Sequence, residues 1–153
     1  MTLQGAAIVR TLGQHDVVTR VRRAIEREQY GANAVIVAAV SGGRDSMALM
    51  VALAVLAEQQ VLGRIVVAHV HHHRRVAADA ELETVKLAAA DFGLSFEVAH
   101  LDGDPKATPA DLRDARYGEL AKIARAQEAV AVATGHQAED QLETVLLAIV
   151  RGA

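Results

Sequence analysis

Apolar residues along the chain fall into two kinds of segment: short continuous runs and longer stretches with helical spacing. The short runs predict strands at 34–40, 65–70, 95–99 and 129–134. The longer stretches predict helices at 17–30, 46–60, 78–92, 109–128 and 138–151. Because strands and helices alternate, we expect right-handed βαβ crossovers and an α/β fold, a doubly wound parallel sheet with helices on both faces.

Two of these helices carry start signals in the sequence. Asp16 precedes an amphipathic stretch and is the expected N-cap of a helix that ends before Gly31. Thr108 is followed by Pro109 and Asp111, which place an N-cap, a proline at the first helical position and an acid in the first turn. The second signal predicts where that helix begins to within one residue.

Length and composition indicate one compact unit. At 153 residues the chain has the size of a single domain, and no repeat, low-complexity tract or linker divides it. Hydrophobic residues make up 52% of the chain but aromatic residues only 3%, so the core must consist of Ala, Val, Leu and Ile. We expect residues 1–153 to form a single domain.

Charge and cysteine content exclude several classes of function. The net charge of −3 gives no general attraction to nucleic acid, so any RNA contact must be a local patch. The absence of cysteine excludes disulfides, thiolate zinc sites, iron–sulfur clusters and cysteine nucleophiles. The first 30 residues contain no long apolar run, so we expect neither a signal peptide nor a membrane span, and a cytoplasmic location.

The strongest chemical signal follows the first predicted strand. In a doubly wound sheet, ligands bind at the carboxyl ends of the strands, and the segment there is Ser41-Gly42-Gly43-Arg44-Asp45-Ser46. Two glycines let the backbone turn tightly and bring N–H groups against phosphate oxygens, and the helix that follows adds its positive end. Asp45 suggests a divalent cation that bridges carboxylate and phosphate. The alternative is an ordinary Gly-Gly turn.

A run of imidazoles and guanidiniums follows the second predicted strand. It reads His69-Val70-His71-His72-His73-Arg74-Arg75. One interpretation is a transition-metal site, although adjacent residues point in different directions and no partner with metal-ligand spacing lies nearby. A second interpretation is a loop that faces a nucleotide or an anionic substrate, and a third is a plain solvated loop.

A polar segment also follows the fourth predicted strand. His136, Asp140 and Glu143 are spaced four and three residues apart, which would place them on one face at the start of a helix. Acidic residues are also favoured at any helix N-terminus by the helix dipole, so a solvated first turn is the alternative.

The three polar segments together resemble tRNA(Ile)-lysidine synthetase, a member of the N-type ATP pyrophosphatase, or PP-loop, group. The first segment matches the group's Ser-Gly-Gly-x-Asp-Ser signature in full. The second is similar to His-Val-Asn/His-His-Gly-Leu-Arg and departs from it at His73 and Arg74. Residues 112–117 are similar to Ala-Arg-x-x-Arg-Tyr, and 135–152 to a His-His-x-x-Asp-Asp-Gln-x-Glu-Thr block with Glu139 at the first Asp.

This resemblance covers residues 34–152 and implies a reaction. ATP would activate C2 of a wobble cytidine of tRNA(Ile) as an adenylate with release of pyrophosphate, and the amino group of lysine would then displace AMP. ATP and Mg²⁺ are the implied cofactors, and tRNA(Ile) and lysine the implied substrates. The C-terminal tRNA-binding domain of the family is not part of these 153 residues, so we expect weak nucleic-acid binding by this domain alone. A homodimer is compatible with the sequence.

The resemblance also implies roles for individual residues. Catalytic roles fall to Asp45, Asp140 and Arg113, and the two aspartates would also hold the metal. Nucleotide binding falls to residues 41–46 together with His69 and His136, and substrate contacts to Arg75, Arg116 and Glu143. Because the glycine-loop signature is shared with GMP synthetase, NAD synthetase and tRNA thiolases, two alternatives stay open: a PP-loop enzyme with another acceptor, and an ATP- or AMP-binding module without ligase activity.

Overall fold

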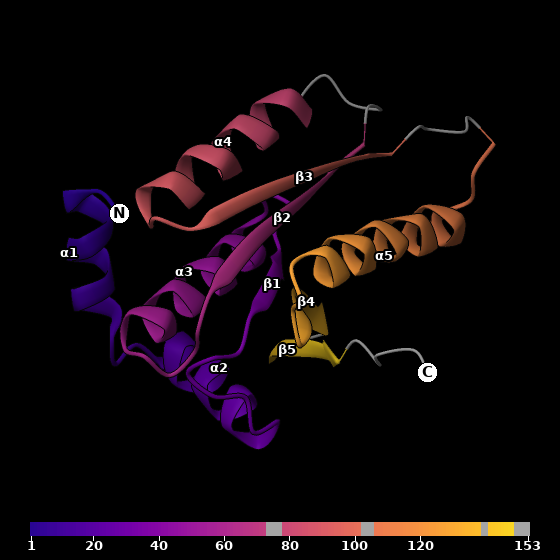
Figure 1. Ribbon diagram of the computed structural model, residues 1–153. Coiled ribbons are helices and arrows are strands. Elements are labelled where there is room, and N and C mark those ends of the chain that lie inside the picture. Colours follow the sequence, from indigo (N-terminus) through magenta and orange to yellow (C-terminus); the bar gives the residue numbers. More distant parts are fainter. Residues whose placement is uncertain (73–77, 102–105, 139–140, 149–153) are drawn as a thin grey trace.

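A five-stranded sheet forms the centre of the molecule, with strand order β3-β2-β1-β4-β5 (Figure 1). The computed structural model describes residues 1–72, 78–101, 106–138 and 141–148. The strands are β1 (Ile36–Ala39), β2 (Ile65–His72), β3 (Ser95–Leu101), β4 (Ala131–Ala138) and β5 (Gln141–Ala148). Neighbours among β3, β2, β1 and β4 pair in parallel, whereas β5 pairs with β4 in the antiparallel sense. The predicted parallel α/β sheet is confirmed.

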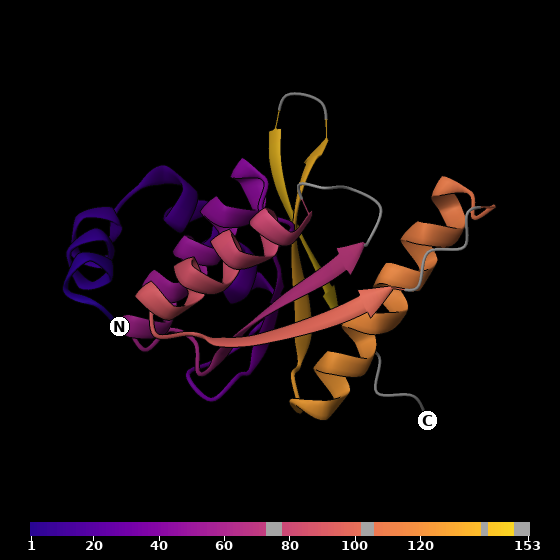
Figure 2. The ribbon, with the colours of Figure 1, turned by 90° about the horizontal axis from the view of Figure 1, so that it is seen from above.

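Helices cover both faces of this sheet, as predicted. They are α1 (Leu3–Leu12), α2 (Asp16–Arg27), α3 (Arg44–Glu58), α4 (Ala78–Asp91) and α5 (Pro109–Ala126). Apolar side chains of α1 to α4 share one core cluster with one face of the sheet, and those of α5 share a second cluster with the other face. Figure 2 shows α5 across the strands from α3 and α4. Of the helices described, none is long and apolar enough to cross a lipid bilayer.

The central strand β1 shows why an unbroken apolar run was needed. Each of its four residues is 2% exposed or less. Ile36 and Ala38 join the cluster under α3, while Val37 and Ala39 join the cluster under α5, as the period of two in a strand requires. Ala39 lies between Ala68 of β2 and Thr134 of β4. The residues that follow these three positions therefore meet at one edge of the sheet.

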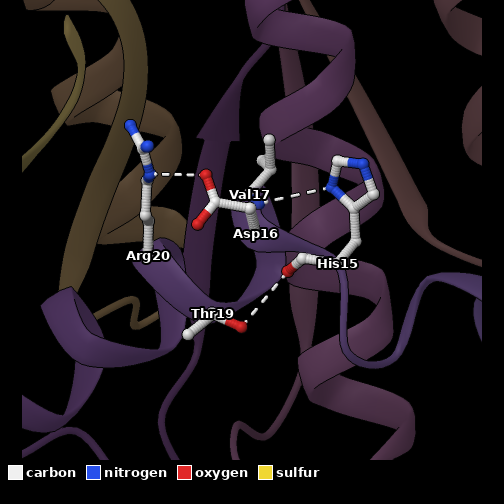
Figure 3. Close-up of polar contacts among 5 residues, drawn as sticks. All are labelled: His15, Asp16, Val17, Thr19 and Arg20. Atoms are coloured by element: carbon white, nitrogen blue, oxygen red, sulfur yellow. Dashed lines mark hydrogen bonds and ion pairs between the residues drawn. The ribbon is translucent and has the colours of Figure 1, made fainter.

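The start of α2 differs from the prediction by one residue (Figure 3). His15 is the N-cap, because its Nδ1 accepts a hydrogen bond from the Val17 N–H at 3.3 Å and Thr19 Oγ1 donates to its carbonyl at 3.2 Å. Asp16 is instead the first helical residue, and it forms an ion pair with Arg20 one turn later at 2.8 Å. An acid at this position favours the helix because it faces the positive end of the dipole.

The capping signal at α5 is confirmed in full. Thr108 Oγ1 accepts from the Asp111 N–H at 3.2 Å, and the Asp111 carboxylate accepts from the Thr108 N–H at 2.9 Å. These hydrogen bonds from the Thr108 side chain and backbone lower the pKa of Asp111. The box fixes the first turn of α5, which faces the carboxyl edge of the sheet (Figure 1).

The helix predicted at 138–151 is wrong in the described part of that segment. Residues 141–148 form strand β5, and its pairing with β4 runs from Ala131 opposite Ala148 to Ala138 opposite Gln141. This pairing satisfies backbone groups that β4 would otherwise expose as an edge strand. The run from Val145 to Ala148 is apolar and short, and periodicity alone does not separate helix from strand in such runs.

Helix α1 was not predicted. Thr2 is its N-cap and accepts a hydrogen bond from the Gly5 N–H at 3.1 Å. The Thr2 N–H in turn donates to the main-chain oxygen of Asp91 at 2.9 Å, so the helix is attached to the end of α4. A Cβ added at Gly5 would lie 2.1 Å from the same Asp91 oxygen, which explains the glycine in this helix. The N-cap threonine is the signal from which α1 could have been predicted.

Candidate nucleotide site

The glycine loop after β1 is held in shape by Ser46. The Ser46 hydroxyl donates to the Gly43 carbonyl at 2.8 Å and accepts from the Ser41 N–H at 3.2 Å. It also lies 3.2 Å from the Ser41 hydroxyl. Ser46 is 5% exposed, so its side chain supports the loop from inside. The signature serine at 46 therefore acts on the loop's conformation, and the signature serine at 41 lies nearer the solvent.

Gly42 and Gly43 give the loop its turn, in which the Gly43 N–H donates to the Ser41 hydroxyl at 3.4 Å. Gly42 has a φ of +90°, a backbone conformation that residues other than glycine rarely adopt. Gly43 is the N-cap of α3 and forms no side-chain capping hydrogen bond. The first N–H groups of a helix have no partner within the helix, and α3 is 15 residues long. The loop and the start of α3 therefore present main-chain donors suited to an anion.

Gly135 on β4, the first residue of the segment 135–152, allows a close approach between β4 and α3. A Cβ at this position would lie 3.0 Å from the Asp45 carbonyl oxygen and 3.1 Å from the Ser46 nitrogen. The strand thus packs directly against the main chain of the first turn of α3. Its place directly after the predicted strand at 129–134 was the available signal, because backbone approaches of this kind require glycine.

One cavity of about 540 Å³ opens beside the loop, a volume in the range of small-molecule sites. It brings together Ser41 and Gly43 of the loop, His69 of β2, and Arg113 and Arg116 of α5. Five of the predicted site residues thus share one cavity, although they come from three separate parts of the chain. Val40, Ala68, Val70 and Leu112 form its apolar wall, and the cavity is also lined by Ala78, Glu81, Pro109 and Tyr117.

His69 offers a hydrogen-bond acceptor in this cavity wall. Its Nδ1 lies 2.7 Å from the Val40 carbonyl oxygen, which can only accept, so the proton is on Nδ1. Burial lowers the pKa of His69, and this outweighs the opposite effect of the bond to Val40 and of the Glu81 charge. The imidazole is therefore neutral near pH 7, and Nε2 carries a lone pair.

The histidine run after β2 begins inside the sheet, not in a loop. β2 extends to His72, two residues beyond the predicted strand. His71 is 2% exposed, its Nε2 lies 3.1 Å from the Asp79 carboxylate, and its ring packs 5.4 Å from that of His100. Among the residues that the structure describes, no three His, Asp or Glu side chains are placed to bind a metal. The transition-metal interpretation gains no support there.

The α5 wall of the cavity is cationic. The guanidinium of Arg113 lies 5.1 Å from the centre of the Tyr117 ring, and its Nη2 is 3.4 Å from the Tyr117 hydroxyl. Arg116 is half-buried one turn away on the same side, and its charge acts on His69. Stacking on an aromatic ring orients a guanidinium for bidentate contacts with anions.

Asp45 is a predicted catalytic and metal-binding residue that is not part of the cavity lining. It is a half-buried residue in the first turn of α3, its main chain contacts Gly135, and it does not line the cavity. No hydrogen bond or ion pair joins its carboxylate to another described residue. A free carboxylate beside a phosphate loop fits Mg²⁺, which takes one or two protein oxygens and completes its shell with water and phosphate.

The described residues do not include every predicted site residue. Arg75 and Asp140 lie outside the described residues. His136 and Glu143 were predicted to share one face of a helix, and this is wrong. They are cross-strand partners in the β4–β5 pair. They are neighbours because two strands pair, and their position at the carboxyl edge of the sheet does not depend on the helix that was expected.

Comparison with known proteins identifies relatives of the chain. Residues 14–153 match the family model of the PP-loop domain. Three tRNA(Ile)-lysidine synthases are similar to the chain: those of Bradyrhizobium diazoefficiens (40% identical over 121 residues), Polaromonas naphthalenivorans (37% over 118) and Streptococcus gordonii (31% over 118). The matches cover 77%, 75% and 77% of this chain and 34%, 35% and 27% of those proteins, so the chain spans about a third of their length or less.

Solved structures show the same fold at lower sequence identity. A U34-tRNA thiolase from Methanococcus maripaludis superposes with a TM-score of 0.70 at 17% identity, covering 80% of this chain and 44% of that one. An NH3-dependent NAD synthetase from Campylobacter jejuni superposes with a TM-score of 0.51 at 14% identity, covering 84% and 55%. The chain belongs to the PP-loop family, whose domains bind ATP.

Proposed function

We propose that this chain is the ATP-using domain of a tRNA-modifying ligase of the lysidine type. The C2 oxygen of a wobble cytidine in tRNA(Ile) attacks the α-phosphorus of ATP, and the bond to pyrophosphate breaks. The lysine amino group then attacks C2, AMP leaves with the C2 oxygen, and the amine loses its proton. Similarity to three lysidine synthases supports this choice of acceptor.

One observation carries the proposal: a single cavity joins the glycine loop to Arg113 and Arg116. Both steps of the reaction develop negative charge on phosphate groups and need no protein nucleophile. Main-chain donors of residues 41–46 would hold the leaving pyrophosphate, and Arg113 would stabilise the charge that develops. Arg116, with Arg75 and Glu143, would contact the substrates, while His69 and His136 would lie against the nucleotide. Positioning of this kind is the larger part of phosphoryl-transfer catalysis.

Asp45 is the described residue that would hold a Mg²⁺ ion, and Asp140 is the proposed second ligand. The metal would supply positive charge to the phosphates. Asp45 itself would hold that charge from the first turn of α3, whose main chain is packed against Gly135.

The test is release of pyrophosphate from ATP in the presence of lysine and tRNA(Ile). We expect turnover that requires both the tRNA and lysine and that yields a tRNA with altered mobility and one added lysine mass. Because the chain spans about a third or less of the lysidine synthases, the assay is run on this chain and on a fusion to the remaining part of one of them. Turnover that does not depend on tRNA, in both this chain and the fusion, would contradict the proposal.

A second candidate is a PP-loop enzyme with another acceptor, which the fold shared with a thiolase and an NAD synthetase favours. Replacing lysine by ammonia or sulfide in the same assay separates the two, because only the second candidate would turn over. ATP binding without pyrophosphate release under any acceptor would instead indicate a nucleotide-binding module.

Two further parts of the proposal concern partners. We expect this domain alone to bind tRNA weakly and in a strongly salt-dependent way, because its net charge is −3. Submicromolar binding that is insensitive to salt would contradict this. A homodimer is the proposed assembly, and the mass of the chain in solution tests it directly.

A further inference from the structure

Two charged side chains line the cavity without a partner of their own. Glu81 projects from the first turn of α4 and Arg116 from α5, and both contribute to the cavity wall. No hydrogen bond or ion pair joins either side chain to another residue that the structure describes. Arg116 suits the phosphates, whereas Glu81, an exposed acid in the first turn of α4, repels them, so a nucleotide group that meets Glu81 would have to be a hydrogen-bond donor.

The position of Glu81 relative to the loop narrows the choice. Its Cβ and Cγ would lie 3.5 and 3.7 Å from a Cβ added at Gly42, so the side chain starts directly beside the loop. Its charge also reaches His69 on β2. The main chain of Asp45, the residue proposed to hold a metal, lies against Gly135 of β4, and Asp45 does not line the cavity. Glu81 does line the cavity.

A nucleotide in this cavity would place its sugar beside Glu81. The phosphates would lie on residues 41–46, and the apolar wall of Val40, Ala68, Val70 and Leu112 suits a base. The sugar joins these two parts and must lie next to the loop, where Glu81 is. Sugar hydroxyls are donors, and an ionised carboxylate is the strongest acceptor for them among protein side chains.

We propose that Glu81 accepts a hydrogen bond from a sugar hydroxyl of the bound nucleotide and makes the site selective for ribonucleotides over deoxyribonucleotides. The inference rests on the proposed binding of ATP in this cavity and adds a specificity-determining residue to it. Selectivity arises because a deoxynucleotide leaves the carboxylate without its donor. The acceptor of the ligase reaction does not enter the argument.

The experiment measures dissociation constants by calorimetry for ATP, 2′-deoxyATP and 3′-deoxyATP, each with Mg²⁺. We expect the wild-type chain to bind at least one deoxynucleotide about tenfold or more less tightly than ATP, the usual size of a charge-assisted hydrogen bond. In Glu81→Ala, the affinity for ATP should fall to that of this deoxynucleotide, and the affinity for the deoxynucleotide itself should not fall. Glu81→Gln, which keeps the shape and a carbonyl acceptor, should retain part of the selectivity.

The matched control is Glu83→Ala. Glu83 is an exposed acid on the same helix that does not line the cavity, so its removal should leave all three affinities unchanged. Equal selectivity in the wild type and in Glu81→Ala overturns the inference while leaving ATP binding intact. A loss that is equal for all three nucleotides and requires Mg²⁺ would make Glu81 a metal ligand and also overturns it. A wild-type chain that binds none of the three overturns the inference together with the function on which it rests.

Discussion

Gly135 of β4 lies against Asp45 of α3 so closely that a Cβ at position 135 would stand 3.0 Å from the Asp45 carbonyl oxygen. The contact is between main chain and main chain, and it joins the fourth strand to the first turn of the helix that carries the glycine loop. The position of that first turn therefore depends on the absence of one side chain.

Gly135→Ala should displace the first turn of α3 and weaken nucleotide binding. We expect a loss of about 1–3 kcal/mol in stability, the usual cost of overpacking, and a lower affinity for ATP. Thermal unfolding and calorimetry measure the two effects. The control is Gly118→Ala on α5, where an added Cβ meets nothing within 4 Å and should stabilise the helix by up to about 1 kcal/mol. If both variants bind ATP as the wild type does, the contact has no role in the site.

Ser46→Ala removes the hydroxyl that bridges Ser41 and Gly43. Because the Gly43 carbonyl and the Ser41 N–H lose their partner, we expect destabilisation of about 1–3 kcal/mol and weaker ATP binding. Thr84→Ala is the control, since that hydroxyl is exposed and bonds only to the Ala80 carbonyl of its own helix. Unchanged stability and affinity in Ser46→Ala would show that the loop keeps its shape without the bridge.

Asp45→Asn should leave the fold intact and slow the activation step. The carboxylate has no hydrogen bond or ion pair among the described residues, so its loss should cost the fold little, and its proposed role is to hold a ligand. We expect pyrophosphate release to fall by about 10²-fold, the usual effect of losing one charge-stabilising group, with thermal unfolding unchanged. Asp114→Asn, an exposed acid on α5 that does not line the cavity, should keep full activity. A variant that unfolds, or one that turns over normally, contradicts the role of Asp45.

His69 should make stability depend on pH. Burial lowers the pKa of His69 in the folded chain, whereas the unfolded chain keeps a value near 6.5. The unfolded state therefore binds more protons below about pH 6.5, and stability is full above this pH and is lost as pH falls. In His69→Gln the drop in unfolding temperature between pH 7.5 and 5.5 should be smaller than in the wild type. An equal drop in both would show that His69 does not carry this dependence.

Local patterns predicted most of the elements because each pattern had one physical solution. The run that contains Ile36 to Ala39 is rich in β-branched residues, which favours a strand covered on both sides, and Thr108 with Asp111 favours a helix start. The segment after Gly135 had two solutions, since a short apolar run can form a helix or pair with the edge of a sheet. Residues 141–148 form a strand by pairing with β4, and the pattern of apolar residues within the segment does not reveal that partner.

The sequence predicted those parts of the site whose function follows from residue type, and it did not predict the parts that depend on contacts between distant segments. The loop at 41–46 and the cations Arg113 and Arg116 could be named from the sequence, and the cavity brings them together. The contacts of Ser46 and the place of Glu81 in the cavity could not, because each depends on which part of the fold lies beside it. For Gly135 the available signal was its place directly after the predicted strand at 129–134.

The central claim is that the main-chain donors of the glycine loop hold the phosphates of ATP, and a crystal structure with Mg²⁺ and a non-hydrolysable ATP analogue tests it most directly. We predict phosphate oxygens within hydrogen-bond distance of main-chain N–H groups of residues 41–46, with the base against Val40, Ala68 and Val70. An analogue whose phosphates lie away from residues 41–46 would contradict the account.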